Sequence, residues 1–188
     1  MAATSMASIL ASAISSKRPW ALLCLILACA FTPSAFAEGV YLSQDQFLAE
    51  SFDGEPPPAQ LMWLTGPLRE QVSDILGHAP RAARVRYWSN AQRSAWVLEE
   101  IGKEQPITMG FVVDNGELHA TRVLIYRESR GWEIRHDFFT RQFERLRLTE
   151  QHRLSGPVDN ISGATLSVSA ARRMARVALL LDRHRPRS

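Results

Sequence analysis

Two apolar runs flank an Asn-Gly pair, and this arrangement constrains the fold more than any other feature of the sequence. The runs cover residues 107–113 and 118–126, with Asn115-Gly116 between them. Asn and Gly tolerate the positive φ angles that a tight hairpin turn requires. The stretch therefore predicts two consecutive antiparallel strands.

Two further strands are predicted upstream of this hairpin. Residues 84–88 alternate polar and apolar side chains, and residues 94–101 form a second strand-like run. Side chains alternate between the two faces of a strand, so we expect Val123 and Ile125 to share one face of the sheet.

Helical patterns precede the strands. Ser43, followed three residues later by Gln46, has the capping-box arrangement and opens a weak helical pattern over residues 40–52. A second short helix is predicted over residues 68–76, because a proline precedes it and Gly77 can end it.

The last helix follows residue 164 and has one apolar face. Its apolar residues recur at steps of four, four, three and four: Leu166, Ala170, Met174, Val177 and Leu181. The order of elements predicts an α+β fold, with the C-terminal amphipathic helix packed on an antiparallel sheet and short helices near the N-terminus.

The N-terminal segment has the features of a secretory signal peptide. Lys17 and Arg18 precede an uncharged run over residues 20–31, and small residues fit cleavage after Ala37. The run is shorter than the roughly 20 residues that span a bilayer as a helix. We therefore expect export to the periplasm, with an uncleaved membrane anchor or a lipidated Cys29 as alternatives.

Cleavage would also change the composition. Both cysteines, Cys24 and Cys29, would leave with the segment, so the mature chain would contain no disulfide. The formal charge would fall from +3 to +1, because Lys17 and Arg18 leave without any acid. The remaining arginines are scattered and the five histidines lack metal-ligand spacing, so neither nucleic-acid binding nor a metal site is predicted.

The strongest candidate site is the turn that leads into the last helix. Residues 159–165 read Asp-Asn-Ile-Ser-Gly-Ala-Thr. Unpaired backbone N–H groups and the helix dipole favour an anion such as phosphate at a helix N-terminus. A purely structural interpretation is also open, in which Asp159 or Ser162 caps the helix and Gly163 supplies an unusual φ angle.

This string resembles the flavinylation signature D-x-x-S-G-A-T of the FMN-binding domain family. That family includes flavin-carrying subunits of the sodium-pumping NADH:quinone reductase and of its ferredoxin-linked relatives. Upstream, residues 127–134 resemble the family's E-T-P-G-x-G loop, and Phe138 with Gln142-Phe143 resembles the segment that follows it. The resemblance covers about residues 107–181.

The resemblance implies a covalent cofactor. Thr165 would carry FMN through a phosphoester that a flavin transferase makes from FAD. The backbone of Ser162, Gly163 and Ala164 would surround the phosphate.

Four further residues are implied at the same site. Asp159 would belong to the string that the transferase recognises, and Leu166 would pack beside the flavin. Glu128 and Gly131 match the loop that lies against the flavin ring.

The loop departs from the family pattern at three positions. Ser129 stands in place of Thr, Arg130 in place of Pro, and Glu133 in place of the second Gly. These departures leave open which residues of the loop contact the flavin ring, and whether Trp132 stacks on the flavin or faces solvent. Arg172 is a candidate to stabilise the anionic reduced flavin.

The sequence thus predicts an exported electron-transfer protein with FMN on Thr165, an electron carrier more than a stand-alone enzyme, with a membrane oxidoreductase or cytochrome as partner. One alternative is a flavin-free periplasmic binding or interaction module in which the turn only caps the last helix; another is non-covalent FMN. The expected organisation is a signal peptide (1–37), an N-terminal arm with a Pro-rich connector (38–66), the FMN-binding domain (67–183) and a frayed tail (184–188).

Overall fold

The computed structural model describes residues 39–187. The expected signal peptide, its cleavage site after Ala37 and Cys29 lie outside the described residues. Within residues 39–187, no helix combines the length and the apolar character needed to cross a membrane.

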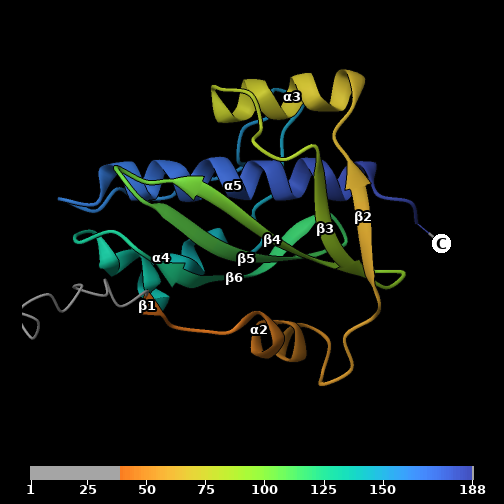
Figure 1. The fold of residues 1–188 in the computed structure, drawn as a ribbon, viewed down its shortest axis with the longest axis horizontal. Coiled ribbons are helices and arrows are strands. Elements are labelled where there is room, and N and C mark those ends of the chain that lie inside the picture. The colour runs from red at the N-terminus through yellow and green to blue at the C-terminus, as the bar shows by residue number, and fades with distance from the viewer. Residues whose placement is uncertain (1–38, 188) are drawn as a thin grey trace, which may run out of the picture. The chain divides into compact units, whose positions relative to one another are not determined.

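Within the same residues, six strands form one antiparallel sheet in the order β1-β6-β5-β4-β3-β2 (Figure 1). The strands are β1 Gly39–Val40, β2 Ala59–Trp63, β3 Arg84–Ser89, β4 Arg93–Ile101, β5 Pro106–Asp114 and β6 Glu117–Tyr126. The predicted hairpin between β5 and β6 is confirmed, since Asn115 and Gly116 have φ angles of 50° and 79°.

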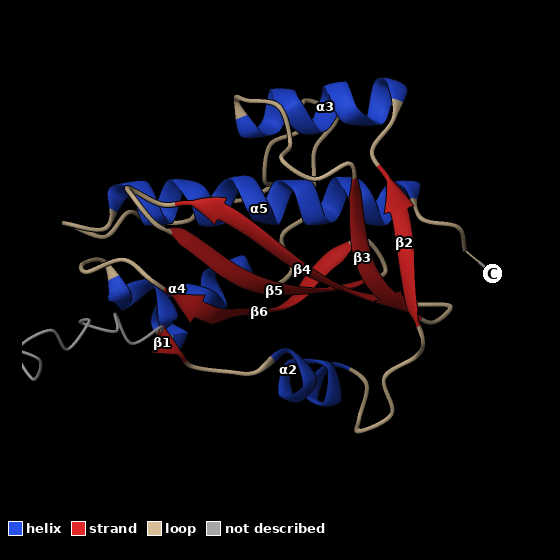
Figure 2. Cartoon of the chain, viewed as in Figure 1, coloured by secondary structure: helices blue, strands red, loops and turns tan. Residues whose placement is uncertain are grey.

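Helices cover both faces of this sheet (Figure 2). The long helix α5, Thr165–His184, contacts β4, β5 and β6 on one face, and α3, Gly66–Leu76, packs on α5. Helix α2, Gln44–Ser51, covers the opposite face. The short α4, Asp137–Thr140, lies between two 3-10 turns, η1 Trp132–Arg135 and η2 Arg141–Phe143. The predicted α+β class is confirmed.

The helix boundaries in the N-terminal half follow the local signals. Ser43 and Gln46 form both hydrogen bonds of the capping box at the start of α2. Helix α3 has a proline in its first turn and ends at Gly77, whose φ of 80° is left-handed. Both predicted helices are therefore confirmed, although the first begins at Gln44 and Val40 belongs to strand β1.

Two strands within the segment expected to form an arm, β1 and β2, supply the two edges of the sheet. Strand β1 pairs with β6 at one edge, and β2 pairs with β3 at the other. Strand β2 has the sequence Ala-Gln-Leu-Met-Trp, in which apolar and polar residues do not alternate, and only Met62 is buried. This segment is a strand because it pairs with β3, whose residues lie more than 20 positions later in the sequence, so adjacent residues alone did not predict it.

A β-bulge changes the faces predicted for β6. The register shifts between Thr108 and Met109 of β5, and Leu124 is the residue left without a partner. Val123 packs in the core beneath α5, whereas Leu124 and Ile125 both pack on the α2 side. The expectation that Val123 and Ile125 share a face is wrong, because the inserted residue reverses the alternation.

The chain end is held by a buried ion pair. Arg185 Nε lies 2.7 Å from Asp182 Oδ1, and both side chains are 2% exposed. Ser94 donates to the same carboxylate at 2.6 Å, and the Arg185 guanidinium also donates to two backbone carbonyls in the β3–β4 turn. Residue 185 is therefore anchored, in place of the frayed tail expected from residue 184.

Gly110, in the middle of β5, allows α2 to dock on the sheet. A Cβ atom at this position would lie 2.6 Å from Cζ of Phe47, which is fully buried. The aromatic ring therefore occupies the space that any other residue at position 110 would need.

We expect Gly110→Ala to lower the free energy of unfolding by about 1–3 kcal/mol, because the Phe47 ring must move to admit the methyl group. Urea denaturation measures this change. In a Phe47→Ala background the same substitution should cost much less, since the ring is absent. An undiminished cost in that background would contradict the steric explanation.

Candidate functional site

Four segments meet at one end of the sheet and enclose a pocket of about 350 Å³. They are the β4–β5 turn, the loop after β6, the turn at residues 159–164 and the first turn of α5. The lining residues are Lys103, Glu104, Glu128, Ser129, Arg130, Gly163, Ala164, Thr165, Leu166 and Ser167.

Tyr126 joins the loop after β6 to the start of α5. Its hydroxyl donates to the carbonyl of Arg130 at 2.5 Å and lies 2.9 Å from Oγ of Ser167. Because the phenol has a single proton, Ser167 is the donor in the second bond. Burial is the main cause that raises the pKa of Tyr126, so the phenol stays protonated.

Gly131 allows the same two segments to touch. Its φ is +83°, and an added Cβ would lie 2.8 Å from the Tyr126 hydroxyl oxygen and 3.2 Å from Cβ of Ala164. A side chain at position 131 would therefore separate the loop from α5. Gly131 itself does not line the pocket.

Glu128 holds the β4–β5 turn. Its Oε1 accepts hydrogen bonds from the backbone N–H groups of Lys103, of Glu104 at 2.6 Å and of Gln105 at 3.0 Å. Burial raises the pKa of the Glu128 carboxyl, but the three N–H groups and the Lys103 ammonium outweigh this effect, and the pKa lies below its ordinary value. Glu128 lines the pocket with its carboxylate already engaged.

The turn at residues 159–164 is held from outside. Gln142 Oε1 accepts from the backbone N–H of Asp159 at 2.6 Å, and Gln142 Nε2 donates to the carbonyl of Phe138 at 3.2 Å. Arg172 donates to the carbonyl of Val158. Arg172 therefore supports the turn and does not line the pocket, contrary to its expected position beside the flavin.

The start of α5 is not capped by a side chain. The N-cap is Ala164, which has no side-chain capping bond to the backbone of the first turn. The structural interpretation that Asp159 or Ser162 caps this helix is therefore wrong. Both residues are exposed and neither lines the pocket.

The remaining predicted residues meet at the rim. Gly163, with φ of +83°, and the buried Ala164 form the turn immediately before the helix. Thr165 is exposed, and its Oγ1 accepts from Asn160 Nδ2 at 3.0 Å. Leu166 is 51% exposed, although the helical pattern had placed it on the buried face.

Sequence reasoning missed Lys103, Glu104, Tyr126 and Ser167. The first two belong to an ordinary polar turn far away in sequence. Tyr126 ends a predicted strand, and its position immediately before the candidate loop was the available signal. Only the fold brings the β4–β5 turn to the start of α5.

Comparisons with known proteins agree with this geometry. Residues 102–180 match the family model of the FMN-binding domain. The matched range runs from the β4–β5 turn into α5 and so includes all four segments of the pocket. Nothing matches among the curated proteins or among the solved structures. The resemblance to the FMN-binding domain family is confirmed, whereas the one to the sodium-pumping reductase subunits stays a prediction.

We expect Glu128→Gln to lower the urea midpoint at neutral pH, because the substituted amide carries no negative charge to bind the three N–H groups. The wild-type advantage should shrink as the pH falls below about 4.3, the ordinary carboxyl pKa, and disappear below the lower folded-state value. The sign follows because a lowered folded-state pKa stabilises only the ionised form. Glu104→Gln, an exposed carboxyl in the same turn, is the control and should leave the midpoint unchanged.

Proposed function

Residues 102–180 belong to the FMN-binding domain family, and from this we propose that the protein is an exported electron carrier with FMN bound covalently to Thr165. When bound, FMN supplies one- and two-electron redox chemistry, while the protein supplies orientation and electrostatics. The observation that carries the proposal is the exposed Thr165 hydroxyl at the rim of the pocket.

The surroundings of Thr165 suit modification by a large enzyme. Gly163 and Ala164 leave no bulky side chain beside the hydroxyl, and the Asn160 amide orients it. A flavin transferase would join the Thr165 oxygen to the FMN phosphorus of FAD. AMP would leave with the electrons of the broken P–O bond, and the hydroxyl proton would be released.

The first turn of α5 supports a phosphodiester at this position. With Ala164 as N-cap, no side chain occupies the N–H groups that open the helix. These groups and the positive end of the helix dipole stabilise an anion. The phosphate of a Thr165 phosphoester would lie at that end.

The pocket offers both apolar and cationic surface for the ring system. Ala164 and Leu166 supply the apolar part, and Lys103 and Arg130 supply two positive charges. The Lys103 ammonium also lies 3.4 Å from the Glu104 carboxylate, and the Glu128 carboxylate is bound by the β4–β5 turn. We assign the stabilisation of the anionic reduced flavin to these two cations and not to Arg172, which is engaged with the backbone.

We also propose that the flavin transferase and then the electron partner dock at this end of the molecule. Trp132 and Phe138 are exposed near this site. Gly131, next to Trp132, packs against Tyr126 and Ala164, and Gln142 binds both the Phe138 carbonyl and the backbone N–H of Asp159. Aromatic side chains are enriched where proteins associate. For an exported carrier the partner would be a membrane oxidoreductase or a cytochrome.

The flavin-free alternative has less support. It requires the turn to serve as a helix cap, yet no side chain of the turn caps α5. A flavin-free module also gives no reason for three features of this site. They are the exposure of Thr165 and Leu166, the left-handed φ angle of Gly163 and the adjoining pocket.

The linkage can be tested directly. The protein is produced with a flavin transferase, and we expect flavin fluorescence to persist after denaturing electrophoresis, with a mass gain of one FMN less water. Thr165→Val should abolish both signals, because it removes the accepting oxygen. Thr165→Ser should restore part of the fluorescence.

Thr65→Val is the matched control. Thr65 is also exposed at a helix start, and its side chain makes no capping bond. This variant should be labelled as fully as the wild type. Labelling that survives Thr165→Val would refute the attachment site, and FMN that binds but washes out under denaturing conditions would establish the non-covalent alternative.

A further inference from the structure

Strands β3 and β4 separate partway along their length. Their pairing ends at Tyr87 and Trp96. Beyond that point residues 84–86 pair only with β2, and residues 97–101 pair only with β5. Figure 1 shows the two strands diverging. The sheet therefore has an opening between β3 and β4.

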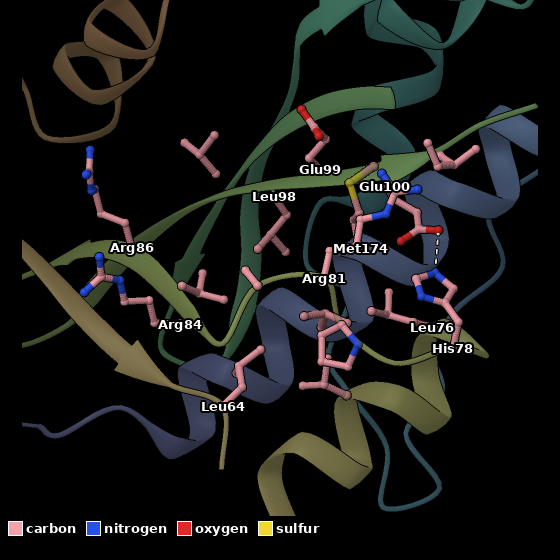
Figure 3. A pocket seen from close by; sticks show the side chains of 17 residues that line it. Leu64, Leu76, His78, Arg81, Arg84, Arg86, Leu98, Glu99, Glu100 and Met174 are labelled. Atoms are coloured by element: carbon pink, nitrogen blue, oxygen red, sulfur yellow. Dashed lines mark hydrogen bonds and ion pairs between the residues drawn. The ribbon is translucent and has the colours of Figure 1, made fainter. Parts of the chain in front are cut away.

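Beneath this opening lies a second pocket, of about 300 Å³ (Figure 3). Its floor is apolar and comes from helices on the inner face: Val72 and Leu76 of α3, and Met174 and Val177 of α5. Leu98 of β4 projects into it from one side. A cavity of this size and lining suits a small apolar group.

The rim of the second pocket is cationic. Val85 packs toward the core beneath α5, so its neighbours Arg84 and Arg86 lie on the outer face of the sheet, beside the opening. Arg81 in the preceding loop also lines the pocket. Among the described residues, no carboxylate pairs with any of these three arginines. The Arg84 guanidinium lies 5.6 Å from the centre of the Trp63 ring, a contact that leaves its N–H groups available.

The carboxylates of the pocket are already compensated. Glu100 is buried and lies 3.0 Å from His78 Nε2 and 3.1 Å from an Arg173 guanidinium nitrogen. Hydrogen bonds to the Ala79 carbonyl and to Glu100 raise the pKa of His78 and favour the imidazolium. Glu99 pairs with an arginine of the loop after β6. The three rim arginines are therefore the charges left for a ligand.

We infer that this pocket binds a single-chain amphiphile with an anionic head group, of the fatty-acid type. The chain would lie on the floor between α3 and α5, and the head group would meet Arg84 and Arg86 at the opening. An apolar floor alone would accept any hydrophobic molecule, whereas the unpaired arginines select the anion.

The inference does not depend on FMN. Leu166 in the first pocket and Met174 in the second are eight residues apart on α5, about 12 Å along the helix. Loss of the flavin linkage therefore leaves the second pocket intact. The Thr165→Val protein should bind the amphiphile as the flavinylated protein does.

Dodecanoate is the probe, titrated by calorimetry into the purified flavinylated protein below the concentration at which micelles form. We expect one site. Dodecyltrimethylammonium, with the same chain and a cationic head, should bind at least about tenfold more weakly, because it meets the arginines instead of a carboxylate.

Variants locate the site. Combined Arg84→Gln and Arg86→Gln should weaken dodecanoate binding about tenfold or more. Arg153→Gln, which removes an exposed arginine elsewhere, should not change it. Leu98→Trp should fill the cavity and abolish binding. If Leu98→Trp fails to fold, the comparison of the combined Arg84→Gln and Arg86→Gln variant with Arg153→Gln still decides the question, because these substitutions alter only exposed side chains.

Several outcomes would overturn the inference. One is that dodecanoate does not bind, and another is that the cationic amphiphile binds as tightly as dodecanoate. The third outcome is an unchanged dodecanoate affinity in both the combined Arg84→Gln and Arg86→Gln variant and the Leu98→Trp variant. Tighter binding of the extended peptide Glu-Val-Glu-Val-Glu would assign the opening to a polypeptide that pairs with the free edge of β4.

Discussion

The hydrogen bond between Tyr126 and Ser167 is the contact on which the rest of the site depends. It joins the last residue of β6 to the first turn of α5, 41 residues later in the chain. Gly131 makes this possible, because a side chain there would collide with the Tyr126 hydroxyl. Without this contact, the loop after β6 and the turn before α5 would be two separate surface segments. With it, they become two walls of one pocket.

Helix α5 is the rigid element that serves both pockets. Its C-terminal end is fixed by Asp182, which binds Arg185 and Ser94 in a buried network. Its middle rests on the sheet, and its first turn extends to the rim, where Thr165 and Leu166 are exposed. A helix held at its far end can present a reactive residue at its start without loss of position. This arrangement supports the proposal that FMN is attached to Thr165.

Local signals predicted the elements that local energetics control. The Asn-Gly hairpin, the capping box of α2 and the glycine stop of α3 depend on a few adjacent residues, and all are confirmed. Features that depend on distant partners were missed. The β-bulge at Leu124 reversed the faces of β6, and β2 became a strand only through its pairing with β3. The buried anchor at Arg185 lay in residues that resemble an exposed tail.

The sequence by itself was enough to locate the candidate site at residues 159–165 and to match residues 102–180 to the FMN-binding domain family. The reason is that the signature is contiguous and can be recognised without the folded structure. Tertiary structure decided what surrounds it. Glu128 is occupied by the β4–β5 turn, Arg172 holds the backbone, and Lys103 lies at the pocket instead. The physical reason is that hydrogen-bond partners are assigned by proximity in space, and the sheet brings together segments that lie more than 60 residues apart.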